Sequence, residues 1–239
     1  ELVVTTPPAL FGCADPAPTD SIGFDAAIEI GKALPPVQRA IRPDDLALLQ
    51  YTGGTTGISK AVMTTHRNLA TLVEMLRMAI AGHVDPGRDL VISVHPFFHS
   101  AGLSVNLLQY ATNGARQLLF PKSKSADLVV AGWRGRPVNA ILAGPAFYNS
   151  LVSTPGFDEL DFSALRGGFV GGMPLRPDIR ERWERITGTP LIEGYGLTEL
   201  AGPVTGQMGK DPRAYSVGYP FPSVELTTRG PDDRAVPPG

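Results

Sequence analysis

The segment from Tyr51 to Lys60 combines the features that a protein needs to hold a polyphosphate. Its glycines and hydroxyl side chains are Gly53, Gly54, Gly57, Thr52, Thr55, Thr56 and Ser59. Glycine lets backbone N–H groups turn toward an anion, hydroxyls add donors, and Lys60 adds a point charge. A solvent-exposed turn is the alternative for a segment of this composition. We interpret the segment as a phosphate-binding loop, because four further motifs agree with that chemistry.

The spacing of this loop differs from that of a Walker loop, which requires G-x-x-x-x-G-K-[ST]. Gly53 and Gly57 lie four residues apart, and Ala61 rather than Ser or Thr follows Lys60. The chain then enters the apolar segment 61–64, which has a strand pattern, so no helix dipole holds the phosphate. Backbone amides, hydroxyls and Lys60 are the expected ligands.

A second motif, EGYGLTE, occupies residues 193–199. Two glycines flank Tyr195 in a predicted turn that follows a strand, and the tyrosine ring offers a face on which adenine can stack. Thr198 and Glu199 then supply a hydroxyl and a carboxylate, which suit an α-phosphate and a magnesium ion. The alternative is a glycine turn with a solvated glutamate.

Two histidines, His95 and His99, lie four residues apart in the segment HPFFH. Pro96 argues against a helix through them, and no cysteine or carboxylate is near in sequence, so we reject a zinc site. A buried, hydrogen-bonded histidine without a catalytic task is one alternative for His99. The apolar residues of segment 97–105 are equally compatible with the wall of a ligand cavity, which the family resemblance given below implies to be an acyl tunnel, and with ordinary core.

Strand and helix patterns alternate between these motifs. Predicted strands are 46–51, 61–64, 90–94, 117–120, 138–142, 168–170 and 190–193, and predicted helices are 25–32, 66–81, 103–112, 125–133, 145–153 and 177–187. Such alternation indicates an α/β fold with a mostly parallel sheet, whose ligands bind at the carboxyl ends of the strands. The motifs follow predicted strands, which agrees with that placement.

The chain resembles the acyl-adenylate-forming superfamily of acyl-CoA synthetases, luciferases and peptide-synthetase adenylation domains. Five blocks match in order over positions 44–222: the loop ending at Lys60, then 95–99, 171–175, 193–199 and 217–220. The first block is most similar to the long-chain fatty acyl-CoA synthetases. The resemblance implies that the α/β sheet has helices on both faces and belongs to the large N-terminal domain of an adenylate-forming enzyme.

The resemblance also implies a role for each motif residue. The implied catalytic residues are Lys60, Thr198, Glu199 and His99. The implied nucleotide-binding residues are Thr52, Gly53, Gly54, Thr55, Thr56, Gly57, Lys60, Gly171, Gly172, Met173, Glu193, Gly194, Tyr195, Gly196, Leu197 and Thr198. Thr55 and Glu199 are implied magnesium ligands, and Phe98, His99, Ala101 and Gly102 border the acyl substrate.

The implied reaction activates a fatty acid with ATP and Mg²⁺ through acyl-AMP, and CoA as co-substrate then takes the acyl group. An aryl or other carboxylic acid, a carrier protein in place of CoA, and a non-catalytic nucleotide-binding module are the alternatives. Ser59 and Ala61 stand where the family usually has proline and glycine, which puts the shape of the loop in question.

The expected domain organisation is that of an internal piece of a longer enzyme. Residues 1–43 form a proline-rich connecting arm, 44–222 the AMP-binding core, and 223–239 the start of a β-rich segment. The ribose-binding Thr-Gly-Asp motif, the hinge and the small C-terminal domain with its lysine are absent from this sequence, so we expect the chain alone to be inactive.

Composition limits the partners. A formal net charge of −2 and the lack of a basic run argue against nucleic-acid binding. The single cysteine, Cys13, excludes an intrachain disulfide and suits a reducing cytosol, which predicts a cytoplasmic location. No apolar run reaches the roughly 18 residues of a membrane-spanning helix. Peripheral membrane contact and a homodimer stay open.

Overall fold

The computed structural model describes residues 3–5, 21–52, 59–120, 125–208 and 216–236. The chain divides into two compact units, Glu1–Ile41 and Arg42–Gly239. In the first unit, β1 (Val3–Thr5) pairs in parallel with β2 (Ser21–Gly23), which leads into α1 (Phe24–Lys32). The short helix predicted here is confirmed, whereas the role of residues 1–43 as a connecting arm stays a prediction.

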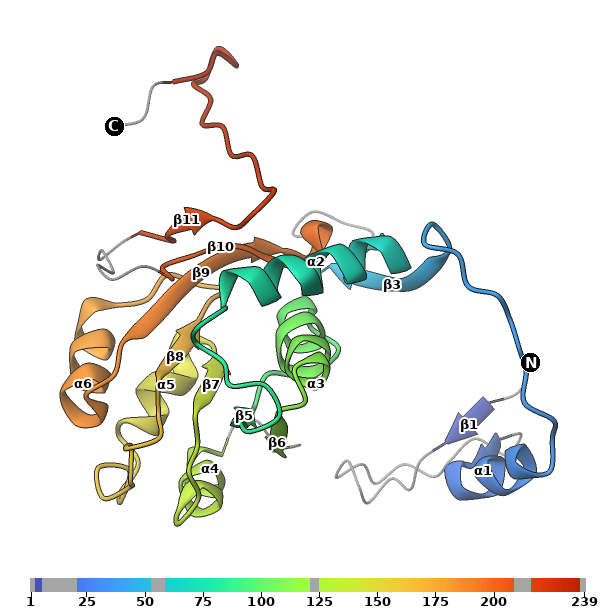
Figure 1. Cartoon of the computed structure of the whole chain (residues 1–239), viewed down its shortest axis with the longest axis horizontal. Coiled ribbons are helices and arrows are strands. Elements are labelled where there is room, and N and C mark those ends of the chain that lie inside the picture. Colours follow the sequence, from blue (N-terminus) through green and yellow to red (C-terminus); the bar gives the residue numbers. More distant parts are fainter. Residues whose placement is uncertain (1–2, 6–20, 53–58, 121–124, 209–215, 237–239) are drawn as a thin grey trace. The chain divides into compact units, whose positions relative to one another are not determined.

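One sheet of seven described strands dominates the second unit, in the order β11-β10-β9-β8-β7-β5-β6. The neighbouring parallel strands are β6 (Arg116–Leu119), β5 (Leu90–Ser93), β7 (Ala140–Ala143), β8 (Gly167–Val170) and β9 (Leu191–Leu197). Antiparallel β10 (Gly202–Gly206) and β11 (Tyr219–Pro220) extend the sheet beyond β9 (Figure 1). The predicted mostly parallel α/β sheet is confirmed.

Helices cover both faces of this sheet. Three of them, α4 (Ala126–Trp133), α5 (Pro145–Leu151) and α6 (Pro177–Thr187), pack in one core cluster with Leu90 and Ile92 of β5. Val91 points to the opposite face, where it packs with Tyr110. Successive residues of a strand point to opposite faces, so β5 is apolar throughout because both of its faces are buried.

The helix predicted over 103–112 is confirmed in position. The structure has a π-helix, η2 (Gly102–Gln109), followed by one α-helical turn, α3 (Tyr110–Thr112). The π-helical type was not predicted, because an apolar run does not separate a π-helix from an α-helix. π-Helical segments are rare and occur frequently at functional sites.

A separate antiparallel hairpin carries the predicted phosphate loop. β3 (Leu46–Thr52) pairs with β4 (Lys60–Thr65), and Thr52 lies opposite Lys60 in the register. β4 leads into α2 (His66–Ala79), which begins there because Thr65 and Asn68 form a capping box. α2 packs through Leu72, Met75 and Leu76 against the β10 region.

The predicted ends of α6 are confirmed, whereas α5 ends at Leu151, two residues before the predicted end. Pro177 opens α6, and Gly188 ends it with a φ of 68° in the left-handed region that favours glycine. Beyond β11 the described residues contain one isolated bridge, Arg229 to Ala235, so the β-rich segment predicted for 223–239 stays a prediction. Among the described helices, none combines the length and apolar character needed to cross a membrane.

Candidate functional site

Three of the sequence motifs meet at one cavity, at the carboxyl ends of β5, β7, β8 and β9. Residues of segment 95–101, which follows β5, line the cavity. So do Gly171 and Gly172, which follow β8, and Glu193, Gly194 and Gly196 of β9. The empty space is about 870 Å³, which includes open solvent. Parallel strands end at the same edge of a sheet, which explains why segments far apart in sequence converge.

The two histidines form a contacting pair in the wall of this cavity. His95 Nε2 lies 3.2 Å from His99 Nδ1, and the rings meet edge to face with centroids 4.6 Å apart. The Ala101 N–H donates to the same Nδ1 at 3.2 Å, so a neutral His99 carries its proton on Nε2. Burial, and then the neighbouring His99, lower the pKa of His95 to about 4, and burial lowers the pKa of His99. The pair is therefore neutral near pH 7.

The segment 193–199 is not the turn that the sequence predicts. β9 continues through Leu197 and pairs with β10, because glycines allow the two backbones to approach. A Cβ atom on Gly196 would lie 2.2 Å from the Gly202 carbonyl oxygen, and one on Gly194 would lie 2.9 Å from that of Thr205. A Cβ on Gly171 would lie 3.1 Å from the Gly194 carbonyl oxygen. Sterics of sheet packing thus account for these glycines.

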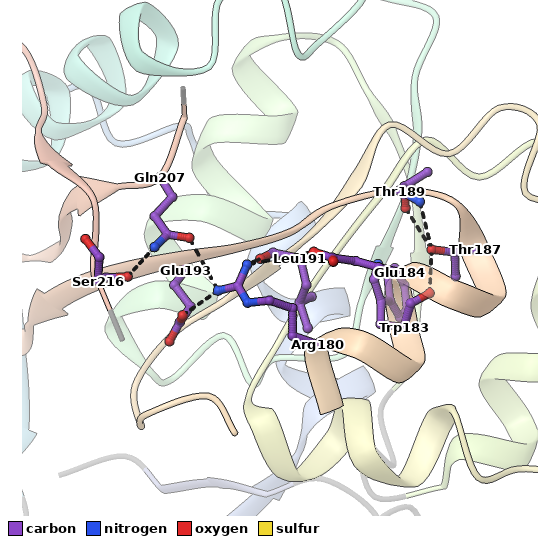
Figure 2. Close-up of polar contacts among 9 residues, drawn as sticks. All are labelled: Arg180, Trp183, Glu184, Thr187, Thr189, Leu191, Glu193, Gln207 and Ser216. Atoms are coloured by element: carbon purple, nitrogen blue, oxygen red, sulfur yellow. Dashed lines mark hydrogen bonds and ion pairs between the residues drawn. The ribbon is translucent and has the colours of Figure 1, made fainter. Parts of the chain in front are cut away.

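The carboxylate of Glu193, a residue that lines the cavity, belongs to a buried polar network (Figure 2). Arg180 of α6 donates to Glu193 Oε2 at 2.5 Å and to the Leu191 carbonyl at 2.7 Å, and the Leu175 N–H donates to Glu193 Oε1 at 3.2 Å. Gln207 accepts from Arg180 and donates to the Ser216 carbonyl. Arg180 and the Leu175 N–H thus hold the Glu193 carboxylate in place, and the predicted nucleotide-binding role of Glu193 stays a prediction.

The remaining residues of this motif are more accessible. Tyr195 and Leu197 are exposed, and Thr198 and Glu199 form a 3₁₀ turn, η3 (Thr198–Leu200), with Glu199 exposed. η3 contacts β4, so the structure brings Thr198 and Glu199 next to the strand that begins at Lys60. The Tyr195 side chain is 44% exposed, and its predicted stacking on adenine stays a prediction.

Magnesium has one predicted carboxylate ligand in the described part of the chain. No group of three or more His, Cys, Asp or Glu side chains there could enclose a metal ion. Glu199 forms no hydrogen bond or ion pair with the described residues. Mg²⁺ is commonly held by one or two carboxylates together with substrate phosphates and water, so a lone exposed carboxylate fits such a site. The other predicted ligand, Thr55, lies outside the described residues.

The hairpin fixes both ends of the predicted phosphate loop. Ser59 Oγ donates to the Thr52 carbonyl at 3.0 Å, and Thr52 Oγ1 lies 3.4 Å from the Lys60 carbonyl. Lys60 is exposed at the start of β4. The loop residues Gly53, Gly54, Thr55, Thr56 and Gly57 lie outside the described residues, so their predicted roles stay predictions.

The predicted substrate residues are placed differently from one another. His99 and Ala101 line the cavity. Phe98 is 84% exposed and is not among the lining residues, while its carbonyl accepts from Gln50 Nε2 at 2.8 Å. Gly102 is buried where a Cβ would lie 2.0 Å from the Pro96 carbonyl oxygen, so it serves close backbone packing. Met173, predicted to contact the nucleotide, is exposed.

A family model described as AMP-binding enzyme matches residues 8–239. The chain belongs to the AMP-binding enzyme family. The resemblance drawn from five sequence blocks is thereby confirmed.

Curated relatives of this AMP-binding chain are fatty-acid ligases. It is 37% identical over 221 residues to a long-chain-fatty-acid–CoA ligase of Escherichia coli O6:H1, which covers 92% of the chain and 39% of the relative. A Bacillus subtilis enzyme of the same description is 34% identical over 184 residues, or 76% of the chain and 32% of the relative. The chain thus spans well under half the length of these relatives.

Solved structures share the fold. The N-terminal domain of FACL13 from Mycobacterium tuberculosis, bound to an inhibitor, superposes with a TM-score of 0.80 at 27% identity, over 98% of this chain and 60% of that one. The anthranilate CoA ligase AuaEII with anthranoyl-AMP gives a TM-score of 0.82 at 22% identity, over 100% of this chain and 44% of that one. The second likeness bears on the fold alone.

Sequence reasoning missed several residues that line the cavity or pack beside its motifs. Arg180 sits in α6 without a motif, and only its burial against Glu193 reveals its role. Gly218, inside the block 217–220, has a φ of 82°, and a Cβ there would lie 2.1 Å from the Gly206 carbonyl carbon. Gln109 lines the cavity from η2. A buried arginine or glutamine gives no periodic signal, so neither could be found from one sequence.

Proposed function

We propose that the chain carries the adenylate-forming site of an ATP-dependent ligase that converts a long-chain fatty acid into its CoA thioester. The observation that carries the proposal is the convergence of three family motifs on one cavity with largely apolar walls. Its aliphatic and aromatic lining includes Leu76, Ile80, Val105, Leu142, Phe169 and Ile192. The 37% identity to long-chain-fatty-acid–CoA ligases favours this substrate class.

In the proposed reaction, the fatty-acid carboxylate attacks the α-phosphate of ATP, and acyl-AMP forms as pyrophosphate leaves. The CoA thiol then attacks the acyl carbon and AMP leaves. Such chemistry needs positioning and neutralisation of charge more than a protein nucleophile. Lys60 and the loop amides would neutralise the phosphates, and Thr198 would contact the α-phosphate.

The neutral histidine pair fits the acid substrate. His99 keeps its proton on Nε2, which can donate to a carboxylate oxygen, and its lowered pKa keeps the imidazole uncharged near neutral pH. Glu199 would hold Mg²⁺ together with phosphate oxygens, and the ion would supply charge neutralisation. The accessible face of Tyr195 would stack on adenine.

ATP–pyrophosphate exchange against a panel of alkyl and aryl carboxylic acids tests the proposal on the full-length product of the gene. We expect exchange that depends on long-chain acids, and a decrease of about a hundredfold in Lys60→Met, because one preorganised cationic contact to the reacting group is lost. Lys32→Met, which removes an exposed lysine of α1, is the matched control and should exchange normally.

Two results would contradict the proposal. If only aryl acids support ATP–pyrophosphate exchange, the substrate is an aryl acid and not a long-chain fatty acid. A lack of exchange with every acid, while ATP still raises the melting temperature, would indicate a nucleotide-binding module, because a ligand of the native state stabilises it. We further propose that the 239 residues bind ATP without turnover, since they span 39% of the curated relatives.

A further inference from the structure

The backbone of the turn that carries His99 has little freedom to move. The His99 N–H donates to the Pro96 carbonyl at 3.0 Å, which closes the turn after β5. The neighbouring Phe98 carbonyl accepts from Gln50 Nε2 of β3 at 2.8 Å. Gly102 packs so closely on this turn that a Cβ there would collide with the Pro96 carbonyl. What can still vary at His99 is the orientation of its ring.

The His99 ring is exposed and lines the cavity, so few contacts determine its orientation. Rotation about χ2 of histidine is broad and roughly two-fold, and a hydrogen bond or packing must select one ring position. Among the described aromatic side chains, only His95 meets the His99 ring, edge to face. His95 is half-buried, lines the same cavity and has no role in the proposed reaction.

The Ala101 N–H decides which atom is the donor in the histidine pair. A backbone N–H can only donate, so the His99 Nδ1 that it reaches at 3.2 Å is an acceptor and carries no proton. The hydrogen bond between His95 Nε2 and His99 Nδ1, also 3.2 Å long, then requires a proton on His95 Nε2. Half a turn of the His99 ring would bring Cδ2, which cannot accept, to these two donors. His95 therefore favours the ring position that leaves the His99 Nε2–H available to a ligand.

We infer that His95 is a positioning residue, which donates from Nε2 to His99 Nδ1 and thereby holds the His99 Nε2–H in place for an oxygen of the substrate carboxylate. The inference rests on the proposed function, because that function assigns His99 to the carboxylate. It adds a residue to the site, since the family resemblance gives a role to His99 and none to His95. His95 acts through the His99 ring and not on the substrate itself.

A double-mutant cycle on the full-length product of the gene tests whether His95 acts through His99. ATP–pyrophosphate exchange is measured with the carboxylic acid of the panel that supports the fastest exchange. We expect His95→Leu to lower kcat/KM for this acid about five- to tenfold, because the hydrogen bond that orients the ring is lost. In the His99→Leu background the same substitution should change kcat/KM by less than about twofold, because the group through which His95 acts is gone.

Two further variants separate the donated hydrogen bond from packing. His95→Gln keeps a side-chain N–H donor at a similar reach from the backbone, so its kcat/KM should stay within about threefold of the wild type. His83→Leu is the matched control, because His83 is a partly buried histidine that is not among the described lining residues. It should exchange at the wild-type rate.

Equal losses from His95→Leu in the wild-type and His99→Leu backgrounds would overturn the inference. Wild-type kcat/KM in His95→Leu, or a His95→Gln variant as slow as His95→Leu, would also overturn it. If the variants do not fold, nitrogen NMR of histidine-labelled wild type decides: a neutral His99 should carry its proton on Nε2, and a proton on Nδ1 would overturn the inference. All these results leave the proposed function standing, whereas a wild type that exchanges with no acid would remove that function and the inference together.

Discussion

The hairpin β3–β4 and the parallel sheet carry motifs of one family, yet they hold them in different ways. In the hairpin, Tyr51 is 68% and Met63 71% exposed, and the Lys60 side chain is exposed. In the sheet, every residue of β5 and β7 is buried, and the glycines of β9 touch neighbouring backbone. Packing therefore fixes the walls of the cavity, whereas in the hairpin hydrogen bonds among Thr52, Ser59 and Lys60 hold the two strand ends together.

The sheet motifs should therefore affect folding stability, and the hairpin motif should affect mainly the reaction. Replacing a motif residue of the sheet destabilises the fold, because the new side chain collides with backbone or a buried charge loses its partner. Residues of the hairpin can change with little effect on folding, since they have few contacts to lose. Three comparisons between variants break or sharpen this contrast.

The largest effect is expected at Arg180. Arg180→Met leaves the buried Glu193 carboxylate without its cation, which should lower the free energy of unfolding by about 3–5 kcal/mol. Urea denaturation measures the change. Arg185→Met, an exposed arginine of the same helix, is the control and should stay within about 0.5 kcal/mol of the wild type.

A second variant separates the charge from the packing. Arg180→Met combined with Glu193→Leu removes both charges and should recover part of the stability lost in Arg180→Met. If Arg180→Met unfolds at the wild-type urea concentration, the network of Figure 2 does not stabilise β9.

A smaller loss is expected at Gly218. Gly218→Ala combines the strain of a positive φ with a Cβ 2.1 Å from Gly206, and we expect a loss of roughly 3 kcal/mol. Gly172→Ala has nearly the same φ, 83°, but open space around the Cβ, and should lose only about 1 kcal/mol. Thermal unfolding of the two variants measures how much stability is lost to a positive φ alone and how much to a close Cβ contact in addition. Equal losses of stability would show that local movement relieves the close contact at Gly218.

Much of the fold could be predicted from the sequence, and the reasons are local. Pro177 begins α6 and Gly188 ends it, because of the backbone conformations that these residues favour. The continuous apolar sequence of β5 indicates that both of its faces are buried. The π-helical type of η2 could not be predicted, because an apolar run does not distinguish helix types. The continuation of β9 through Gly196 could not be predicted either, because it depends on pairing with β10. The motif residues Gly171 and Glu193 were found, but the buried partners that fix them came only from the structure.

The smallest effect is expected in the hairpin. Leu49 of β3 is 50% exposed, and Leu49→Ala should change the free energy of unfolding of the 239-residue chain by no more than about 0.5 kcal/mol. The same substitution in the sheet, Leu191→Ala at a 0% exposed position, should cost about 2–5 kcal/mol, because it leaves a cavity in the core. Urea denaturation of both variants measures the difference. A comparable loss in the two would mean that the hairpin unfolds together with the sheet and that its exposed face is stabilised by contacts with the rest of the chain.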